Sequence, residues 1–183
     1  MEITTTDIPE VLLLKPVVHR DSRGFFLETY REEHFRTQGI EVHFVQDNVS
    51  KSRRDTVRGL HYQIEQQQDK LLTVMQGAIL DIAVDLRHAS PTFGQHSAVK
   101  LTEDNKHQVF IPKGFAHGFS VLSAEALVYY KCSAYYYPEG ERGLYWNDPK
   151  LDIDWQVDEP VVSEKDQNQP LLHEISKEDL FYE

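Results

Sequence analysis

A chain of 183 residues with 40% hydrophobic and 27% charged residues is long enough to fold as one soluble domain around a hydrophobic core. Its net charge of −11 argues against general binding of nucleic acid or of an anionic membrane surface, so an anionic ligand would need locally concentrated positive charge. The single cysteine, Cys132, excludes an internal disulfide and a cysteine zinc cluster. The lack of a secretory leader or a long apolar run predicts a cytoplasmic protein without a membrane span.

The predicted elements are mostly short strands. Residues 30–36 are predicted to be helical, with Gly39 as a stop signal, and residues 176–181 form a second predicted helix. The basic segment 51–58, apart from Arg58, is expected to be a solvated loop. Strands are predicted over 71–75, 78–86, 108–112, 119–122 and 126–137, with Gly and Pro recurring between them. This punctuation is typical of an all-β sandwich or barrel, here expected as one domain, 1–183, with residues 163–183 packing over it.

Two short motifs match the general cupin pattern. Pro112–His117 gives Pro-x-Gly-x-x-His in full, while His61, Lys70 and Gly77 fall in the second half of the other motif. The resemblance implies an all-β, cupin-type jelly-roll barrel with a few short helices and a ligand site in the mouth of the barrel. Metal-binding cupins have a second histidine and a glutamate where this chain has Gln63 and Lys70. Because an ammonium repels a cation and a neutral amide is a poor ligand, no metal and no other cofactor is expected.

Lys70 itself permits two interpretations. A lysine inside a dry barrel can stabilise negative charge on a bound substrate or intermediate. Alternatively, its aliphatic stem packs at the edge of a strand while the ammonium reaches water.

Seven further segments, in the same order along the chain, resemble one cupin family, the dTDP-4-dehydrorhamnose 3,5-epimerases. They are Asp21–Glu28, Phe44–Ser50, Val57–Gln63, Tyr130–Lys131, Tyr135–Tyr136, Trp146–Pro149 and Ser163–Asp166. The resemblance implies an isomerase of rhamnose biosynthesis that inverts C3 and C5 of dTDP-4-dehydro-6-deoxy-D-glucose to give dTDP-4-dehydro-L-rhamnose. It also implies a homodimer in which N-terminal strands cross between subunits.

Epimerisation beside a ketone needs a base, a group that stabilises the enolate, and an acid on the opposite face. His61 suits the base, since an imidazole can be neutral and ready to accept a proton near pH 7, although a lone histidine is more often part of a core. The resemblance places Asp166 against His61, Lys70 beside the enolate oxygen, and Tyr130 as the acid. Tyr129, its neighbour in a tyrosine-rich run, is the alternative acid.

The same resemblance gives the binding residues. Arg23 and Arg58 are expected to clamp the diphosphate, because a guanidinium fork fits phosphate oxygens, although either could instead form a surface ion pair. Trp146, Trp155 and Cys132 are expected to be packing residues. The other residues that match substrate-contacting positions of the family are Phe26, Glu28, Gln46, Asn48, His117, Tyr136, Glu141 and Lys165.

Other functions share these motifs. The same base and acid would serve a relative that inverts only C3 or only C5 in another dTDP-deoxysugar pathway, and a dTDP-sugar 3,4-ketoisomerase shares the fold and the nucleotide. A metal-dependent cupin is disfavoured by Gln63 and Lys70. A non-catalytic binding module would not need His61, Asp166 and Tyr130 together.

Overall fold

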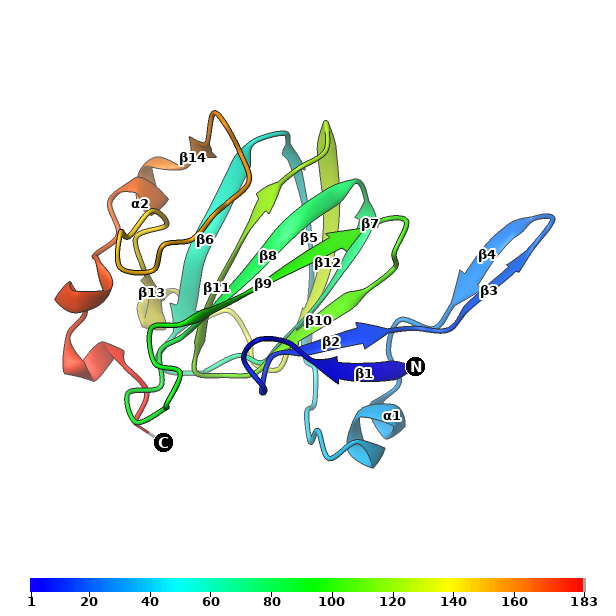
Figure 1. Ribbon diagram of the computed structural model, residues 1–183. Coiled ribbons are helices and arrows are strands. Elements are labelled where there is room, and N and C mark those ends of the chain that lie inside the picture. The colour runs from blue at the N-terminus through cyan, green and yellow to red at the C-terminus, as the bar shows by residue number, and fades with distance from the viewer. Residues whose placement is uncertain (183) are drawn as a thin grey trace.

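The computed structural model describes residues 1–182 and contains two six-stranded sheets (Figure 1). The first sheet has the order β1-β2-β10-β7-β12-β5, and the second has the order β13-β6-β11-β8-β9 with β14 pairing in parallel with β6. The strands of the first sheet are β1 (Glu2–Thr5), β2 (Leu12–Lys15), β10 (Gln108–Ile111), β7 (Lys70–Gln76), β12 (Glu125–Cys132) and β5 (Gln46–Arg53). Those of the second are β13 (Glu141–Gly143), β6 (Thr56–Gln63), β11 (Phe115–Val121), β8 (Ala78–Asp85), β9 (His96–Thr102) and β14 (Val161–Val162). The predicted all-β jelly roll is confirmed.

Within residues 1–182, helical structure is limited to a few short pieces. The first is α1 (Glu32–Thr37), which confirms the predicted helix near residue 30, and the second is α2 (Glu164–Gln167). Three 3-10 turns complete the helical elements of the described part of the chain: Pro138–Gly140, Leu172–Glu174 and Lys177–Asp179. No helix within residues 1–182 is long and apolar enough to cross a membrane.

Strand β8 packs against apolar side chains on both of its faces. Its residues alternate between two faces, and both faces are buried. Ile79 and Ala83 belong to the core between the sheets, whereas Leu80 and Ile82 belong to a second core on the outer face of the second sheet. The C-terminal segment covers that outer face with Leu151, Trp155 and Phe181 among other apolar side chains (orange to red in Figure 1).

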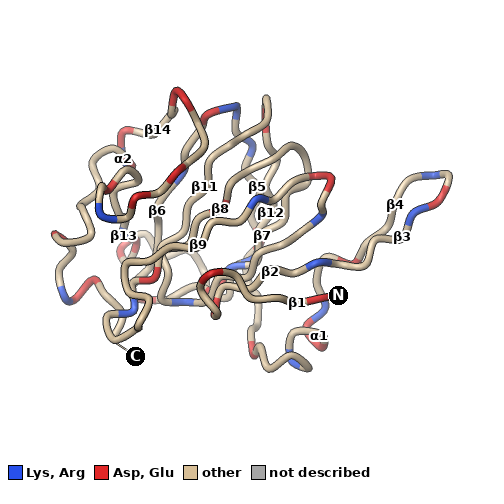
Figure 2. The backbone as a smooth tube through the Cα atoms, viewed as in Figure 1, with Lys and Arg blue, Asp and Glu red and all other residues tan. Residues whose placement is uncertain are grey.

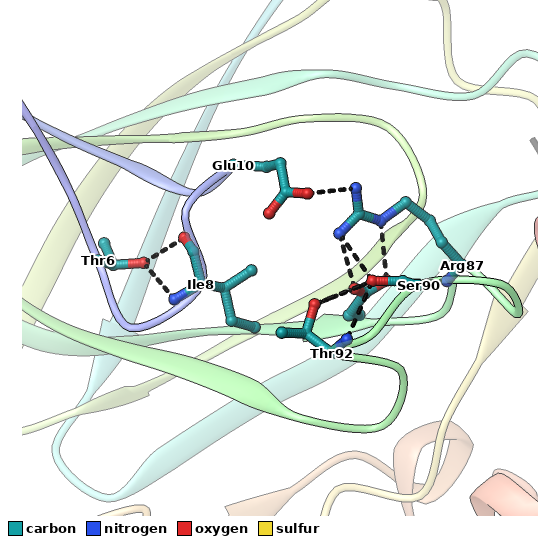
Figure 3. Close-up of polar contacts among 7 residues, drawn as sticks. Thr6, Ile8, Glu10, Arg87, Ser90 and Thr92 are labelled. Carbon is teal, nitrogen blue, oxygen red and sulfur yellow. Dashed lines mark hydrogen bonds and ion pairs between the residues drawn. The ribbon is translucent and has the colours of Figure 1, made fainter.

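A cluster of polar side chains around the buried Asp85 connects Glu10, near the start of the chain, to the β8–β9 connection (Figure 3). Arg87 donates from Nη1 to Glu10 at 2.9 Å and from Nη2 to Asp85 at 2.7 Å. The carboxylate of Asp85 also accepts from the hydroxyls of Ser90 and Thr92. Although burial alone would raise the pKa of Asp85, these donors hold it below its usual value.

Three predicted elements differ from the structure. The basic segment 51–58 is not a continuous loop, because β5 and β6 run through it and only Arg54–Asp55 form the turn. Lys51, Arg53 and Arg54 are exposed, as predicted. The expected helix 176–181 is a single 3-10 turn, since Phe181 bridges to Arg87 and its backbone bonds to Leu86. The strand predicted to reach residue 137 ends at Cys132.

A hairpin formed by β3 (Val18–Asp21) and β4 (Gly24–Leu27), here called the arm, projects away from both sheets (Figure 1). Charged residues lie near its tip (Figure 2), and the aromatic side chains of Phe25 and Phe26 are exposed, the latter at 70%. The arm pairs only with itself among the described strands. It therefore buries little of its own apolar surface within one chain.

Candidate active site

One cavity of about 450 Å³ collects charged and titratable side chains from both sheets. His61 comes from β6 and His117 from β11, where the two histidines are direct cross-strand partners. Lys70 comes from the start of β7 and Tyr130 from β12. We call this space the catalytic cavity. Arg58, Lys165 and Asp166 also line it.

A second cavity of about 220 Å³, called the side cavity, shares His61, Lys70 and Tyr130 with the first. The other predicted site residues that line it are Gln46, Asn48, Tyr136 and Glu141. The two cavities therefore bring together every predicted site residue except Arg23, Phe26 and Glu28. Cys132, predicted to be a packing residue, is buried but also lines the side cavity.

His61 and Asp166 form a close pair. The Nε2 atom of His61 lies 2.6 Å from a carboxylate oxygen of Asp166, whose side chain is almost fully buried. The other oxygen of Asp166 accepts from the backbone N–H of Gly59 at 3.3 Å. Burial alone would raise the pKa of Asp166, but the bonds from His61, Gly59 and Ser163 hold it below its ordinary value. An ionised carboxylate on Nε2 keeps the proton there and leaves Nδ1 as the basic nitrogen.

Asp166 is presented by the short helix α2. Its N-cap is Ser163, whose hydroxyl oxygen accepts from the backbone N–H of Asp166 at 3.1 Å. A serine cap satisfies one of the unpaired N–H groups at the start of a helix. The predicted segment Ser163–Asp166 thus acts as one unit, in which the serine fixes the turn and the aspartate reaches His61.

Two glycines let β6 and β11 approach each other behind this pair. Gly59 has a φ of +118°, and a Cβ added to it would lie 2.6 Å from the Cα of Gly118. The register between the strands shifts at the same place, between His117 and Phe119. Because no side chain fits here, both strands can carry their histidines into one cavity.

Burial shifts the pKa values of Lys70 and Tyr130 in opposite directions. Burial lowers the pKa of Lys70, even though the Cys132 thiol, Asp81 and Glu141 favour the charged form. Among residues 1–182, no carboxylate lies within ion-pair distance of its amino group, so no ion pair competes with a ligand for it. Burial raises the pKa of Tyr130, which keeps its phenol protonated and able to donate.

His117 has a partner that the sequence did not reveal, since Nε2 of His117 lies 2.8 Å from Asp81, and both side chains are buried. Burial lowers the pKa of His117, partly opposed by Asp81, so His117 is neutral near pH 7. The signal for Asp81 was present, because it is an acidic residue inside the apolar stretch 78–86.

The rim of the side cavity is a chain of hydrogen bonds. The hydroxyl of Tyr136 donates to Glu141 at 2.8 Å, and Lys165 pairs with the same carboxylate oxygen. The backbone N–H of Tyr136 donates to Gln46 at 2.8 Å, and Gln46 in turn donates to Asn48 at 3.0 Å. These bonds connect β5, β13 and α2 around the opening.

Gln63, at a metal-ligand position of other cupins, has a structural task here. Its amide nitrogen donates to the backbone oxygens of Gln66 and Tyr135, and its oxygen accepts from the N–H of Tyr137. The side chain thereby orients the loop that carries Tyr136. Within residues 1–182, no group of three or more His, Cys, Asp or Glu side chains is arranged to hold a metal ion.

Three predicted binding residues lie outside these cavities. Arg23 at the tip of the arm is 88% exposed and paired with Asp21, and Phe26 lies beside it in β4. Glu28 follows the arm and pairs with Arg31. A single chain does not bring these residues to the other predicted site residues.

A jelly-roll barrel whose cavity holds a histidine–aspartate pair, a partly buried lysine and a protonated tyrosine defines a cupin-type isomerase. The dTDP-4-dehydrorhamnose 3,5-epimerase family model matches residues 5–174. The dTDP-4-dehydrorhamnose 3,5-epimerase of Pseudomonas aeruginosa is 51% identical over 168 residues, covering 91% of this chain and 93% of the relative, and that of Escherichia coli is 46% identical over 96% of both. The crystal structure of dTDP-6-deoxy-D-glucose-3,5-epimerase from Legionella pneumophila in complex with dTDP-4-keto-L-rhamnose is 47% identical, with a TM-score of 0.97 over 100% of this chain and 98% of that one. The chain belongs to the dTDP-4-dehydrorhamnose 3,5-epimerase family.

Proposed function

We propose that this protein epimerises dTDP-4-dehydro-6-deoxy-D-glucose at C3 and C5 to give dTDP-4-dehydro-L-rhamnose, a step of rhamnose biosynthesis. The observation that carries the proposal is the His61–Asp166 pair in one cavity with Lys70 and Tyr130. Family membership and the sugar nucleotide bound to the Legionella relative support the choice of substrate.

Each inversion requires two proton transfers. Nδ1 of His61 removes the proton from the carbon beside the C4 ketone, and the electron pair of that C–H bond moves to the carbonyl oxygen as an enolate. The ammonium of Lys70 stabilises this oxyanion, an effect typically worth about 10²–10³ in rate. Tyr130 then donates its phenolic proton to the carbon from the opposite face, which inverts the centre. The proton on His61 and the phenolate of Tyr130 are reset by exchange with water.

The nucleotide end of the substrate is assigned to the remaining residues. Arg58 would bind the diphosphate through its guanidinium fork. Arg23, Phe26 and Glu28 would reach the site of a second subunit through the arm, which makes the protein a homodimer. The exposed aromatic side chains of the arm support this, since large apolar side chains gathered on one projection usually mark an interface.

The test is incubation with the dTDP-4-keto sugar in D₂O, followed by mass spectrometry and identification of the product. We expect two solvent deuteriums in the ring for the native chain, and a loss of about 10²–10⁴ in rate for His61→Ala. A single deuterium would indicate a one-carbon epimerase, and a ketone at C3 would indicate a ketoisomerase. No exchange by the native chain would overturn the proposal.

The acid is tested with two neighbouring tyrosines. Tyr130 lines both cavities, whereas the hydroxyl of Tyr129 accepts from Lys131. Tyr130→Phe is therefore expected to slow inversion strongly, by about 10²–10⁴, while leaving proton removal measurable by exchange. Tyr129→Phe, one residue away in the same strand, is expected to keep native rates. The reverse ranking would assign the acid to Tyr129.

A further inference from the structure

We propose that Ser52 is a positioning residue that holds the guanidinium of Arg58 in the orientation needed to bind phosphate oxygens. The inference rests on the proposed function, because it assumes that the ligand of Arg58 is the diphosphate of a nucleotide sugar.

The pattern of β5 places Ser52 inside the barrel. In this strand the even-numbered residues from Gln46 to Ser52 are partly or fully buried, and the residues between them are exposed. Ser52 is the most enclosed of the set, with 8% of its surface exposed. Alternation along a strand therefore points its hydroxyl toward the other sheet.

Arg58 reaches Ser52 from that other sheet. The two residues lie on either side of the turn at Arg54–Asp55, Ser52 in β5 of the first sheet and Arg58 in β6 of the second. Nε of Arg58 donates to the hydroxyl oxygen of Ser52 at 2.9 Å. This bond holds the guanidinium group of Arg58 at Nε, the nitrogen that joins it to the aliphatic part of the side chain.

The bond to Ser52 uses only Nε of the Arg58 guanidinium. Nη1 and Nη2 remain available, and two parallel N–H groups form the fork that binds phosphate. A neutral hydroxyl as the anchor also leaves the positive charge intact. Arg23, Arg87 and Arg142 are each paired with a carboxylate, whereas no ion pair of Arg58 occurs within residues 1–182. Arg58 is thus held in place and still has its charge for an anion.

Without Ser52, the side chain of Arg58 would have to be ordered by the ligand itself, and this entropy cost weakens binding. We expect Ser52→Ala to weaken the binding of dTDP, measured by calorimetry, by about tenfold. Thymidine, which has no phosphate, is expected to bind the variant as it binds the native chain. KM for the keto sugar should rise by the same factor, with kcat nearly unchanged. Ser52→Thr, which keeps the hydroxyl, should restore both the dTDP affinity and KM.

The decisive measurement is a double-variant cycle. If Ser52 acts through Arg58, Ser52→Ala has no further effect on dTDP binding in an Arg58→Ala background. The control is Ser97→Ala in β9, which removes a buried serine hydroxyl that has no partner within residues 1–182 and that lies outside both cavities. It is expected to leave dTDP binding unchanged.

Equal losses of dTDP and thymidine affinity in Ser52→Ala would overturn the inference, because they indicate a general disturbance of the barrel. A further tenfold loss in the Arg58→Ala background would overturn it as well. Failure of the proposed function is seen separately, as a native chain that binds dTDP but does not exchange protons of the keto sugar. The binding cycle still decides the role of Ser52 in that case.

Discussion

At the scale of single residues, Lys70 carries a conflict between stability and function. Burial lowers its pKa below the ordinary 10.5, and no carboxylate within residues 1–182 lies close enough to form an ion pair with it. The folded chain therefore holds this proton less tightly than the unfolded chain does. At neutral pH this lowered pKa opposes folding, and the benefit of the lysine appears only when an enolate is present.

Replacing Lys70 by Met should separate the two effects. We expect Lys70→Met to be more stable than the native chain by about 1 kcal/mol near pH 7 in urea unfolding, and slower in epimerisation by about 10²–10³. Between the pKa of Lys70 in the folded chain and 10.5, the unfolded state of the unmutated chain binds more protons than the folded state does. The stability of the unmutated chain therefore increases with pH over this range, and its difference from Lys70→Met becomes smaller. Lys150→Met, at an exposed position, is the control for the loss of one lysine and should not show this gain in stability. A gap that is absent at pH 7, or that widens with pH, would contradict this account.

At the scale of elements, α2 is too short to be stable alone, since helices of a single turn need outside support. Its support is the cap at Ser163, which also fixes the backbone of Asp166. Ser163→Ala should cost about 1 kcal/mol of stability. It should also lower kcat by roughly tenfold, because the carboxylate that orients His61 loses its fixed position.

The matched control is Ser176→Ala. Ser176 precedes another short turn and donates to Asp179 at 2.8 Å, but lines neither the catalytic cavity nor the side cavity. It should lose comparable stability in thermal unfolding with kcat unchanged. Equal kcat values for the two variants would show that the cap does not position Asp166.

The elements also show what the sequence could and could not reveal. Strands such as β7, β8 and β10 were predicted because alternation and Gly–Pro punctuation are local signals. Residues 51–53 and 176–181 were assigned wrongly, because long-range pairing of β5 with β12 and of Phe181 with Arg87 decides their conformation. Asp166 was found through the family resemblance alone. Asp81 and Ser52 were missed, since their roles depend on partners in neighbouring strands.

At the scale of the whole molecule, the arm separates Arg23 and Phe26 from the rest of the predicted site. It projects from the barrel (Figure 1). Its two phenylalanines, Phe25 and Phe26, are exposed in one chain. Two-fold symmetric dimers exchange such elements in both directions, so each arm would complete the other subunit's cavity. The active unit would then be the dimer, with each site built from two chains.

Mixed dimers test this arrangement. One subunit carries His61→Ala with an intact arm, and the other carries Arg23→Ala and Phe26→Ala with an intact His61; two different tags isolate the mixed pair. If arms act across the interface, one of the two sites has every residue it needs, and the mixed dimer should show roughly half of the native activity per dimer.

The reverse pairing joins a native subunit with one that carries all three changes. Crossing arms leave both of its sites defective, whereas arms acting within their own chain would leave the native subunit fully competent. An inactive first pair with a half-active second pair, or a chain that forms no dimers, would therefore exclude a shared site.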